Sequence, residues 1–278
     1  MTVIQELTEI INLLEASLPA DINSPQSQKL EGALRIKLSK YFRALATAYP
    51  YSSIDKVYTR NVKESAESEA DDVIEPLLRF FTKDLSKYLI DSATTAYIQG
   101  AVEMMTYGQT KMGIPIQFEG PPIDEAIAYA KSHVSKAKLV DGLNETTRKQ
   151  ISKVISDGIK NKRGIPGIKS DIRHKFDWMA RGAPSEIKGR TLASRAEMIA
   201  RTETSNALSQ AQLDKMREME ITGKEWLTAG DDRVSEACMA NESDGPIPRE
   251  QSFSGSGVMA PPEHPNCRCS LAPVMLKK

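Results

Sequence analysis

The chain has 278 residues, of which 40% are hydrophobic and 27% are charged, and 37 Lys and Arg residues balance 37 Asp and Glu residues. This composition is ordinary for a water-soluble protein of one or two domains. No apolar run approaches the roughly 20 residues that a membrane-spanning helix needs, so we expect no membrane partner. An odd number of cysteines (three) and an N-terminal segment without a basic leader argue against a secreted, disulfide-bonded protein. We therefore expect a protein made and kept in a cytoplasm.

The charge is unevenly distributed along the chain. Residues 131–201 hold 17 Lys and Arg against 7 Asp and Glu, whereas residues 1–130 hold 12 against 18 and residues 202–278 hold 8 against 12. Such a basic block suits the phosphates of nucleic acid, bound without sequence preference, or an acidic protein surface. It is equally typical of helices that carry Lys and Arg on their solvent-exposed faces.

Apolar residues recur close to the helical period through the first hundred residues. The pattern predicts a helix over residues 3–18 that ends at Pro19, a second over 26–49, and a third over 65–108 with Pro76 in its first turn. The following segment, 112–123, concentrates Gly and Pro and is typical of a linker, with a short strand at 114–118.

Helices are predicted again after the linker. One covers residues 124–139, and another covers 144–162 with Asn144 as its N-cap. The helical pattern breaks at 164–167 and restarts. A separate long helix is predicted over 191–223, and Gly223 would end it in a left-handed conformation.

The character of the sequence changes after this helix. "KEWLTAGDDR" predicts a strand and a turn, "DGPIP" a turn, "SFSGSGVMAPPEHPN" a loop, and "CRCSLAPVM" a closing strand. The fold class is therefore α+β and predominantly α-helical, with a small, irregular, partly β C-terminal module. We expect a helical N-terminal region at 1–111, a linker at 112–123, a basic helical region at 124–223, and the C-terminal module at 224–278.

The C-terminal module concentrates residue types that are rare elsewhere in the chain. It contains all three cysteines and one of three histidines, namely Cys238, His264, Cys267 and Cys269. Three thiolates and an imidazole suit tetrahedral Zn²⁺, so these four are candidate ligands of a structural zinc ion. Cys267 and Cys269 would point to opposite sides of an extended strand, so both can bind one ion only if the chain turns there. The alternative is that the cysteines are small buried core residues.

A catalytic interpretation competes with the metal site. Cys267 could attack a substrate with His264 as its base and Asp231 or Asp232 orienting the imidazole, as in a hydrolase or toxin. A Cys and a His three residues apart are poorly placed for this, because such partners normally meet across a fold. We therefore expect that the protein is not an enzyme.

Several blocks in order then resemble a known family. They are "RAEMIARTETSNAL" (195–208), "EWLTAGDDRVSEAC" (225–238), "DGPIP" (244–248), "PPEHPNCRC" (261–269) and "LAPV" (271–274). Together they resemble the phage Mu F-like minor head proteins, also called phage head morphogenesis proteins. With the upstream segments 142–159 and 167–176, the resemblance covers roughly residues 125–275.

The resemblance implies a structural role in a tailed phage. It implies a minor procapsid component at the portal vertex, packaged inside the head, with a role in head assembly and in DNA packaging or ejection. The portal protein is the expected partner, with the major capsid or scaffolding protein and non-specific DNA as further ones. Family members often carry a second cysteine where this chain has Ser235, so all four zinc ligands must come from the residues named above.

The motif blocks also suggest a structural network. Arg201 and Glu203 of the "RTET" block and Asp232 and Arg233 of the "DDR" block carry complementary charges that could pin the long helix to the module. Trp226 is expected to anchor the core of the module.

Overall fold

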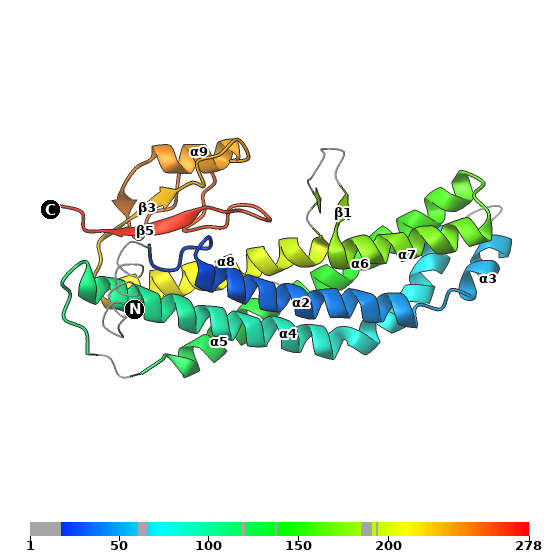
Figure 1. Cartoon of the computed structure of the whole chain (residues 1–278), viewed down its shortest axis with the longest axis horizontal. Coiled ribbons are helices and arrows are strands. Elements are labelled where there is room, and N and C mark those ends of the chain that lie inside the picture. Colours follow the sequence, from blue (N-terminus) through cyan, green and yellow to red (C-terminus); the bar gives the residue numbers. More distant parts are fainter. Residues whose placement is uncertain are drawn as a thin grey trace, which may run out of the picture. The chain divides into compact units, whose positions relative to one another are not determined.

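The computed structural model of the chain describes residues 18–60, 66–117, 120–136, 138–184, 191–192 and 194–277 (Figure 1). The predicted fold class is confirmed, because the chain is mostly helical with a small sheet near its C-terminus. Residues 3–17 of the first predicted helix lie outside the described residues. None of the described helices is long and apolar enough to cross a membrane.

The helices are α2 (Pro25–Ala48), α3 (Ser53–Arg60), α4 (Ala66–Thr110), α5 (Ile123–Lys136), α6 (Leu139–Lys160), α7 (Ile165–Arg181), α8 (Arg195–Glu218) and α9 (Glu236–Ser243). The strands are β1 (Ala183–Pro184), β2 (Thr191–Leu192), β3 (Gly223–Leu227), β4 (Ile247–Pro248) and β5 (Ser270–Val274). Within the segment 114–117, where a strand was predicted, the described residues have no regular structure.

The chain is organised into two compact units built from non-contiguous segments. Unit 1 consists of residues 1–32, 91–130 and 199–278, and unit 2 consists of residues 33–90 and 131–198. The domains expected from the sequence are contiguous, whereas α2, α4, α5 and α8 each contribute residues to both units.

Unit 2 is helical apart from the short strand pair β1 and β2, and its core follows the predicted apolar stripes. The fully buried side chains include Leu34, Leu38, Phe42, Leu45, Ile74, Leu78, Ile151, Ile155, Ile172 and Phe176. Asn144 does not cap a helix, because α6 begins five residues earlier at Leu139. Its side-chain oxygen instead accepts a hydrogen bond from the Tyr41 hydroxyl (2.9 Å), and its amide donates to the Thr82 hydroxyl (3.1 Å). The polar side chain that resembled a cap therefore joins three helices.

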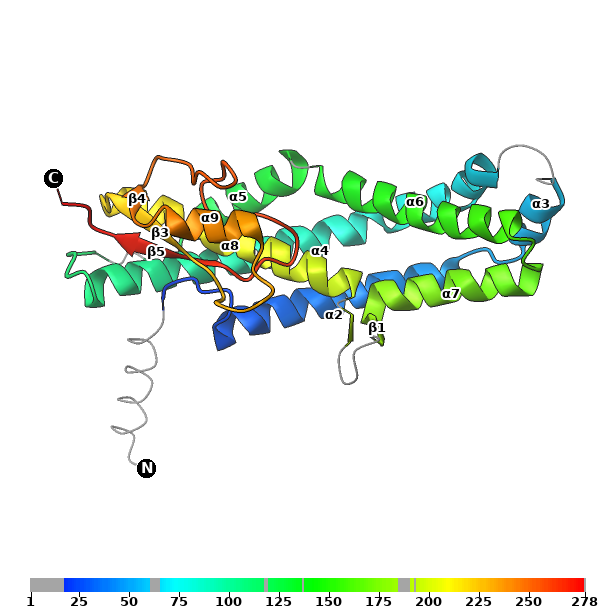
Figure 2. The same ribbon diagram turned by 90° about the horizontal axis from the view of Figure 1, so that it is seen from above.

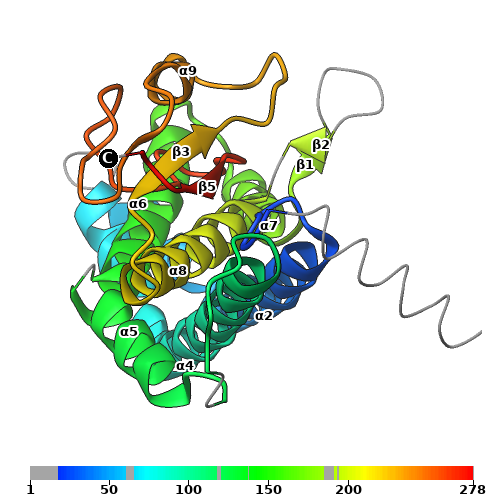
Figure 3. The same ribbon diagram turned by 90° about the vertical axis from the view of Figure 1, so that its left-hand side faces the viewer.

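Unit 1 contains a close contact between α4 and α8 (Figure 3). A Cβ atom at Gly100 would lie 2.8 Å from the carbonyl oxygen of Leu208 and 3.1 Å from its Cα. Ala101 and Ala211 are buried beside this contact, in a cluster that also includes Tyr97. Small side chains therefore allow the two backbones to approach.

The predicted strands around Trp226 and after Cys269 are confirmed as β3 and β5. They pair antiparallel with Trp226 opposite Leu271, and β4 adds to the other edge of β3. The sheet lies with α9 on one side and α8 on the other (Figure 1), and these layers overlap when seen from above (Figure 2). Gln212 of α8 donates a buried hydrogen bond to the Leu271 carbonyl (2.8 Å).

The helix end predicted at Gly223 is wrong. Helix α8 ends at Glu218, and Glu220 takes the left-handed conformation (φ 55°). The amide of Ile221 then bonds the Met216 carbonyl (2.9 Å), which is the pattern of a Schellman motif. Gly223 instead begins β3, where a Cβ atom would lie 2.6 Å from Leu276 and 3.1 Å from the Ile247 carbonyl. The glycine serves close packing of the sheet.

We expect Gly100→Ala to destabilise the protein although alanine favours helices. The new methyl would meet backbone atoms of Leu208, which cannot rotate away, so we expect a loss of about 1–3 kcal/mol. Gly32→Ala is the matched control, since nothing lies within 4 Å of its Cβ position, and it should gain about 0.5–1 kcal/mol. Urea unfolding measures both, and a Gly100→Ala protein as stable as the wild type would contradict the contact.

Candidate metal centre

The three cysteines converge in unit 1. Cys238 lies on α9, and Cys267 and Cys269 lie just before β5. The Sγ atoms of Cys238 and Cys267 are 3.8 Å apart, and all three Sγ atoms lie within 4.8 Å of one another. The three residues are buried and form no disulfide.

A turn brings Cys267 and Cys269 to the same side. Asn266 takes the left-handed conformation (φ 65°), and the amide of Cys267 bonds the His264 carbonyl (3.2 Å). Asparagine is among the few residues that adopt this conformation readily. Cys267 and Cys269 follow this turn and precede β5, so they do not lie on an extended strand. Their side chains are therefore not forced to opposite sides of the chain.

His264 belongs to an adjoining group rather than to the thiol cluster itself. Its ring, Glu263 and Cys238 form a second set of ligand atoms within 4.8 Å, so Cys238 is common to both groups. The Nδ1 of His264 lies 2.9 Å from the Pro265 carbonyl, and a carbonyl can only accept, so Nδ1 carries the proton. A neutral ring in this tautomer leaves Nε2 unprotonated, as a metal ligand requires.

The surroundings of the thiols are apolar, with one polar exception. The core cluster contains Met104, Leu213, Met216, Ile221, Trp226, Ile247, Phe253 and Leu271 besides the cysteines. Trp226 is fully buried, and its ring packs edge-to-face on Phe253 with centroids 5.1 Å apart. No described residue accepts a well-aligned hydrogen bond from its Nε1–H. The N–H nevertheless acts to lower the pKa of Cys269, which favours the thiolate form of that residue. A buried indole N–H beside a sulfur suits a site that holds thiolates.

The thiols influence one another's ionisation. A hydrogen bond from the Cys269 thiol lowers the pKa of Cys267, while burial opposes this. The same hydrogen bond and burial raise the pKa of Cys269, and burial raises the pKa of Cys238. The cluster therefore favours one thiolate at Cys267 and two neutral thiols unless a cation is present.

This geometry fits a zinc site and also fits buried core cysteines, and it disfavours a catalytic cysteine. Zn–S bonds of about 2.3 Å in a tetrahedron place sulfurs about 3.8 Å apart, close to the separation of Cys238 and Cys267. Burial in an apolar cluster also suits packing alone. A nucleophile needs access, but Cys267 is 1% exposed. Asp231, a candidate for orienting His264, is held by Arg268 instead.

The motif blocks meet through contacts other than those predicted. Arg201 binds Glu31 through two hydrogen bonds of 3.0 Å and donates to the Asn266 side chain (2.7 Å). The amide of Asn266 donates to the Thr202 hydroxyl (3.0 Å). The "RTET" block thus meets the asparagine of "PNCRC", and Glu31 of α2 completes the contact. Nothing local in the sequence indicates this last partner.

The "DDR" block meets "PNCRC" as well. The carboxylate of Asp231 accepts hydrogen bonds from both terminal nitrogens of Arg268 (2.5 and 2.7 Å) and from Arg233. The Arg268 hydrogen bond holds the pKa of Asp231 well below its usual range. Asp232, the predicted partner, is exposed on the turn, and Glu203 lies half-buried on α8. The Asp231–Arg268 pair joins the "DDR" block to "PNCRC", whereas the predicted pairing was between the "DDR" and "RTET" blocks.

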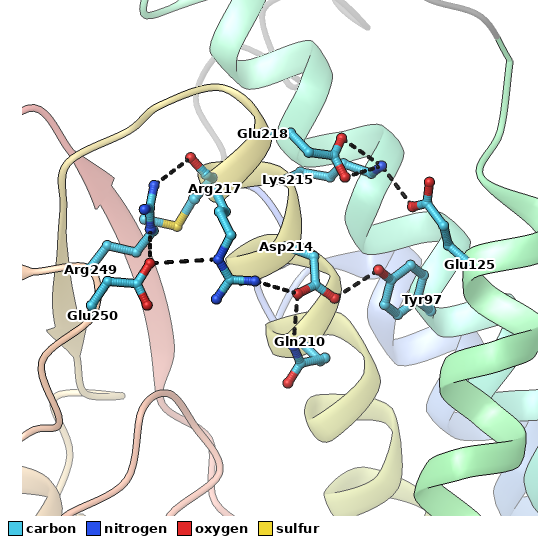
Figure 4. Close-up of polar contacts among 10 residues, drawn as sticks. Tyr97, Glu125, Gln210, Asp214, Lys215, Arg217, Glu218, Arg249 and Glu250 are labelled. Atoms are coloured by element: carbon cyan, nitrogen blue, oxygen red, sulfur yellow. Dashed lines mark hydrogen bonds and ion pairs between the residues drawn. The ribbon is translucent and has the colours of Figure 1, made fainter.

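A polar network that the sequence did not indicate covers the C-terminal half of α8 (Figure 4). Lys215, whose side chain is 5% exposed, donates to Glu125 of α5 (2.8 Å) and to Glu218 (2.9 Å). Tyr97 of α4 donates to Asp214 (2.8 Å), and burial together with this bond raises the pKa of Tyr97. Only the spacing of Lys215 and Glu218, three residues apart on one helix, was visible in the sequence.

The same network ties the end of α8 to the strand region. Arg217 lies 3.6 Å from Glu250, which Arg249 also binds at 2.8 Å (Figure 4). A terminal nitrogen of Arg249 donates to the carbonyls of Met216 and Ile221. Carbonyl groups at a helix end lack partners within the helix, and Arg249 supplies one.

Comparison with known proteins yields one family. Residues 146–272 match the family model described as Phage Mu protein F like protein. No curated protein and no solved structure matches the chain. The matched segment extends from α6 to β5 and contains the three cysteines and His264.

Lys224 is a buried ionisable side chain close to this core. It is 0% exposed, its Nζ donates to the Met259 carbonyl (2.7 Å), and it lies 5.3 Å from the centroid of the Phe253 ring. Burial lowers the pKa of Lys224 to about 8, from an ordinary value near about 10.4. The folded protein thus releases the proton before the unfolded chain does.

We expect Lys224 to make stability rise with pH between about 8 and about 10.4. Below this window Lys224 is protonated in both the folded protein and the unfolded chain, so folding must bury its charge. Within the window Lys224 is protonated only in the unfolded chain. Urea unfolding of the wild type and Lys224→Met at about pH 7 and about pH 9.5 measures this, with the exposed Lys83→Met as control. The stability difference between wild type and Lys224→Met should shift in favour of the wild type at the higher pH. A constant difference would contradict the prediction.

Proposed function

Because residues 146–272 belong to the Phage Mu protein F like family, which comprises phage head morphogenesis proteins, we propose that the chain is a structural minor head protein that acts at the portal vertex. In this role it is a virion component located inside the head, with the portal protein as its principal partner. DNA packaging or ejection is the step of the phage cycle that such a position would influence.

The observation that carries the proposal is the family match together with the way its blocks meet. Arg201 and Thr202 bind Asn266, and Asp231 binds Arg268, so three separate blocks support one module. These side chains are engaged in holding the fold, which suits a structural protein. The only cysteine with a lowered pKa, Cys267, is enclosed in the core and is unsuited to attack a substrate.

Co-expression with the portal protein of the same phage tests the assignment. We expect the two proteins to co-purify and the chain to be present in procapsids and virions, detected by mass spectrometry. Parallel co-expression with the major capsid and scaffolding proteins identifies contacts to the shell. A chain absent from both procapsids and virions would rule out the head-protein assignment.

We further propose that the module binds one structural Zn²⁺ through Cys238, Cys267 and Cys269, with His264 as the fourth ligand. The three sulfurs already lie within 4.8 Å, and His264 presents Nε2 close to Cys238. When bound, the ion would cross-link α9 to the chain preceding β5 and close the loop between Cys238 and Cys267, which are 29 positions apart in the sequence. Closing a long loop is where such a cross-link gains most in chain entropy.

Elemental analysis of protein purified without chelator should find about one zinc per chain. Cys267→Ser should abolish binding, and His264→Ala should weaken it while three thiolates remain. His174→Ala, an exposed histidine of α7, is the matched control and should retain the metal. Affinity should fall as the pH drops, because the ligands must be deprotonated. If the purified protein contains no zinc and a chelator does not change its stability, the zinc proposal is wrong and the cysteines are core residues.

A further inference from the structure

The two compact units carry opposite charge. Unit 2 contains 26 Lys and Arg against 15 Asp and Glu, an excess of 11 positive charges, whereas unit 1 contains 11 against 22. The neutrality of the whole chain therefore conceals a basic unit and an acidic one. Between two copies of the chain, charge favours a contact in which unit 1 of one copy meets unit 2 of the other, because like units repel.

Each unit exposes a helix face with a large apolar side chain at its centre. On α2, in the part of the helix that belongs to unit 2, Ile36 is 53% exposed. On α9, which lies on the side of the sheet away from α8 in unit 1, Met239 is 50% exposed (Figure 1). Single exposed apolar side chains are common, and the charges around these two are what distinguish them.

Basic residues surround Ile36. Arg35 and Lys37 flank it on either side of the helix. Lys40 and Arg43 follow it on its own side, four and seven residues further along. All of them are exposed except Lys37, which is half-buried, and no carboxylate in the described part of the chain binds any of them. We call Ile36 with these four residues the α2 face.

Acidic residues surround Met239. Glu236 and Glu242 lie three residues before and three residues after it, so the methionine lies between the two carboxylates around α9. Both glutamates are exposed, and Glu242 also accepts hydrogen bonds from Thr228. Asp232, on the turn before the helix, is exposed as well. We call Glu236, Met239 and Glu242 the α9 face.

The two faces match in charge, composition and length. A protein interface combines an apolar centre with a polar rim that excludes water and sets the register. Here the centres are an isoleucine and a methionine, and the rims carry opposite charge. The α2 face extends about 10 Å along its helix from Ile36 to Arg43, and the α9 face extends about 9 Å from Glu236 to Glu242.

We propose that a second copy of the chain docks its α9 face on the α2 face, with Met239 against Ile36. The contact is heterologous, because the two faces differ. Each pair of copies therefore retains one free α2 face and one free α9 face, and repetition forms a ring or an open row of copies. Because few residues take part, the contact is weak and favours copies that are already held close together. It requires only the two faces and is independent of a location in the phage head.

Sedimentation velocity of the full-length, nuclease-treated protein tests for the contact. Association at about 100 µM protein should be present at about 50 mM salt and at least about tenfold weaker at about 300 mM, because exposed charges form the rims. Lys40→Glu/Arg43→Glu should weaken it at least about 100-fold by placing acids opposite acids. Ile36→Ser should weaken it about tenfold at low salt by removing the apolar centre. The matched control Lys83→Glu/Lys87→Glu reverses two exposed charges of α4 in the same unit and should associate as the wild type does.

Mixing charge-reversed variants tests which faces pair. Glu236→Lys/Glu242→Lys alone should fail to associate, because its α9 face is then basic like its α2 face. An equimolar mixture with Lys40→Glu/Arg43→Glu restores opposite charges between the two proteins, so association should return. Thermal unfolding of each variant shows that it is folded.

Cross-linking tests the same pairing without reversing any charge. Ile36→Cys and Met239→Cys each place an accessible thiol at the centre of one face, whereas the three native cysteines are buried. Oxidation with diamide should link the two variants when they are mixed, and either variant alone should give only traces of dimer. A wild-type protein that stays monomeric at about 100 µM and about 50 mM salt would overturn the proposal. Same-variant dimers as abundant as mixed ones, or equal losses in the α2 and α4 charge reversals, would overturn it as well.

Discussion

The contact on which the C-terminal module depends is the guanidinium of Arg201. It holds Glu31 of α2 with two hydrogen bonds and Asn266 of the turn before Cys267 with a third. The side chains of Arg201 and Glu31 are only 21% and 10% exposed, so removing Arg201 would leave the Glu31 carboxylate largely buried without this partner. The left-handed conformation of Asn266 also sets the direction of the chain at Cys267. One arginine of α8 thus joins an N-terminal helix to the cysteine cluster.

This contact explains why residues outside the matched family segment belong to the same compact unit. The sheet contains few residues, and the chain from 249 to 269 forms loops, so backbone pairing alone cannot hold the module. The Asn23 side-chain amide donates a hydrogen bond to the Arg268 carbonyl, and the Asp21 carboxylate accepts one from the Ser270 hydroxyl. The segment 18–32 carries no recognisable motif, but its hydrogen bonds hold the turn at Asn266 and the start of β5 in place.

Periodicity and turn residues predicted most helices of unit 2 and the two long strands, because these elements depend on local spacing of apolar residues. Partners distant in sequence were not predictable. Glu31 and Arg201 are 170 residues apart, and no local pattern distinguishes Glu31 from a solvent-exposed acid. Asn144 and Gly223 were misassigned because a polar residue and a glycine have the same local signature whether they end a helix or make a tertiary contact. The cysteines were singled out correctly as a group, but their turn depends on Asn266 and on α8.

Hydrogen exchange followed by mass spectrometry in wild type and Glu31→Gln tests this dependence most directly. The amide of Asn266 donates to Thr202, so it reports whether the turn stays docked on α8. The account predicts faster exchange at residues 264–268 in the variant, with α6 and α7 of unit 2 unchanged. Exchange that increases only in the first turns of α2, while residues 264–268 remain protected, would contradict it.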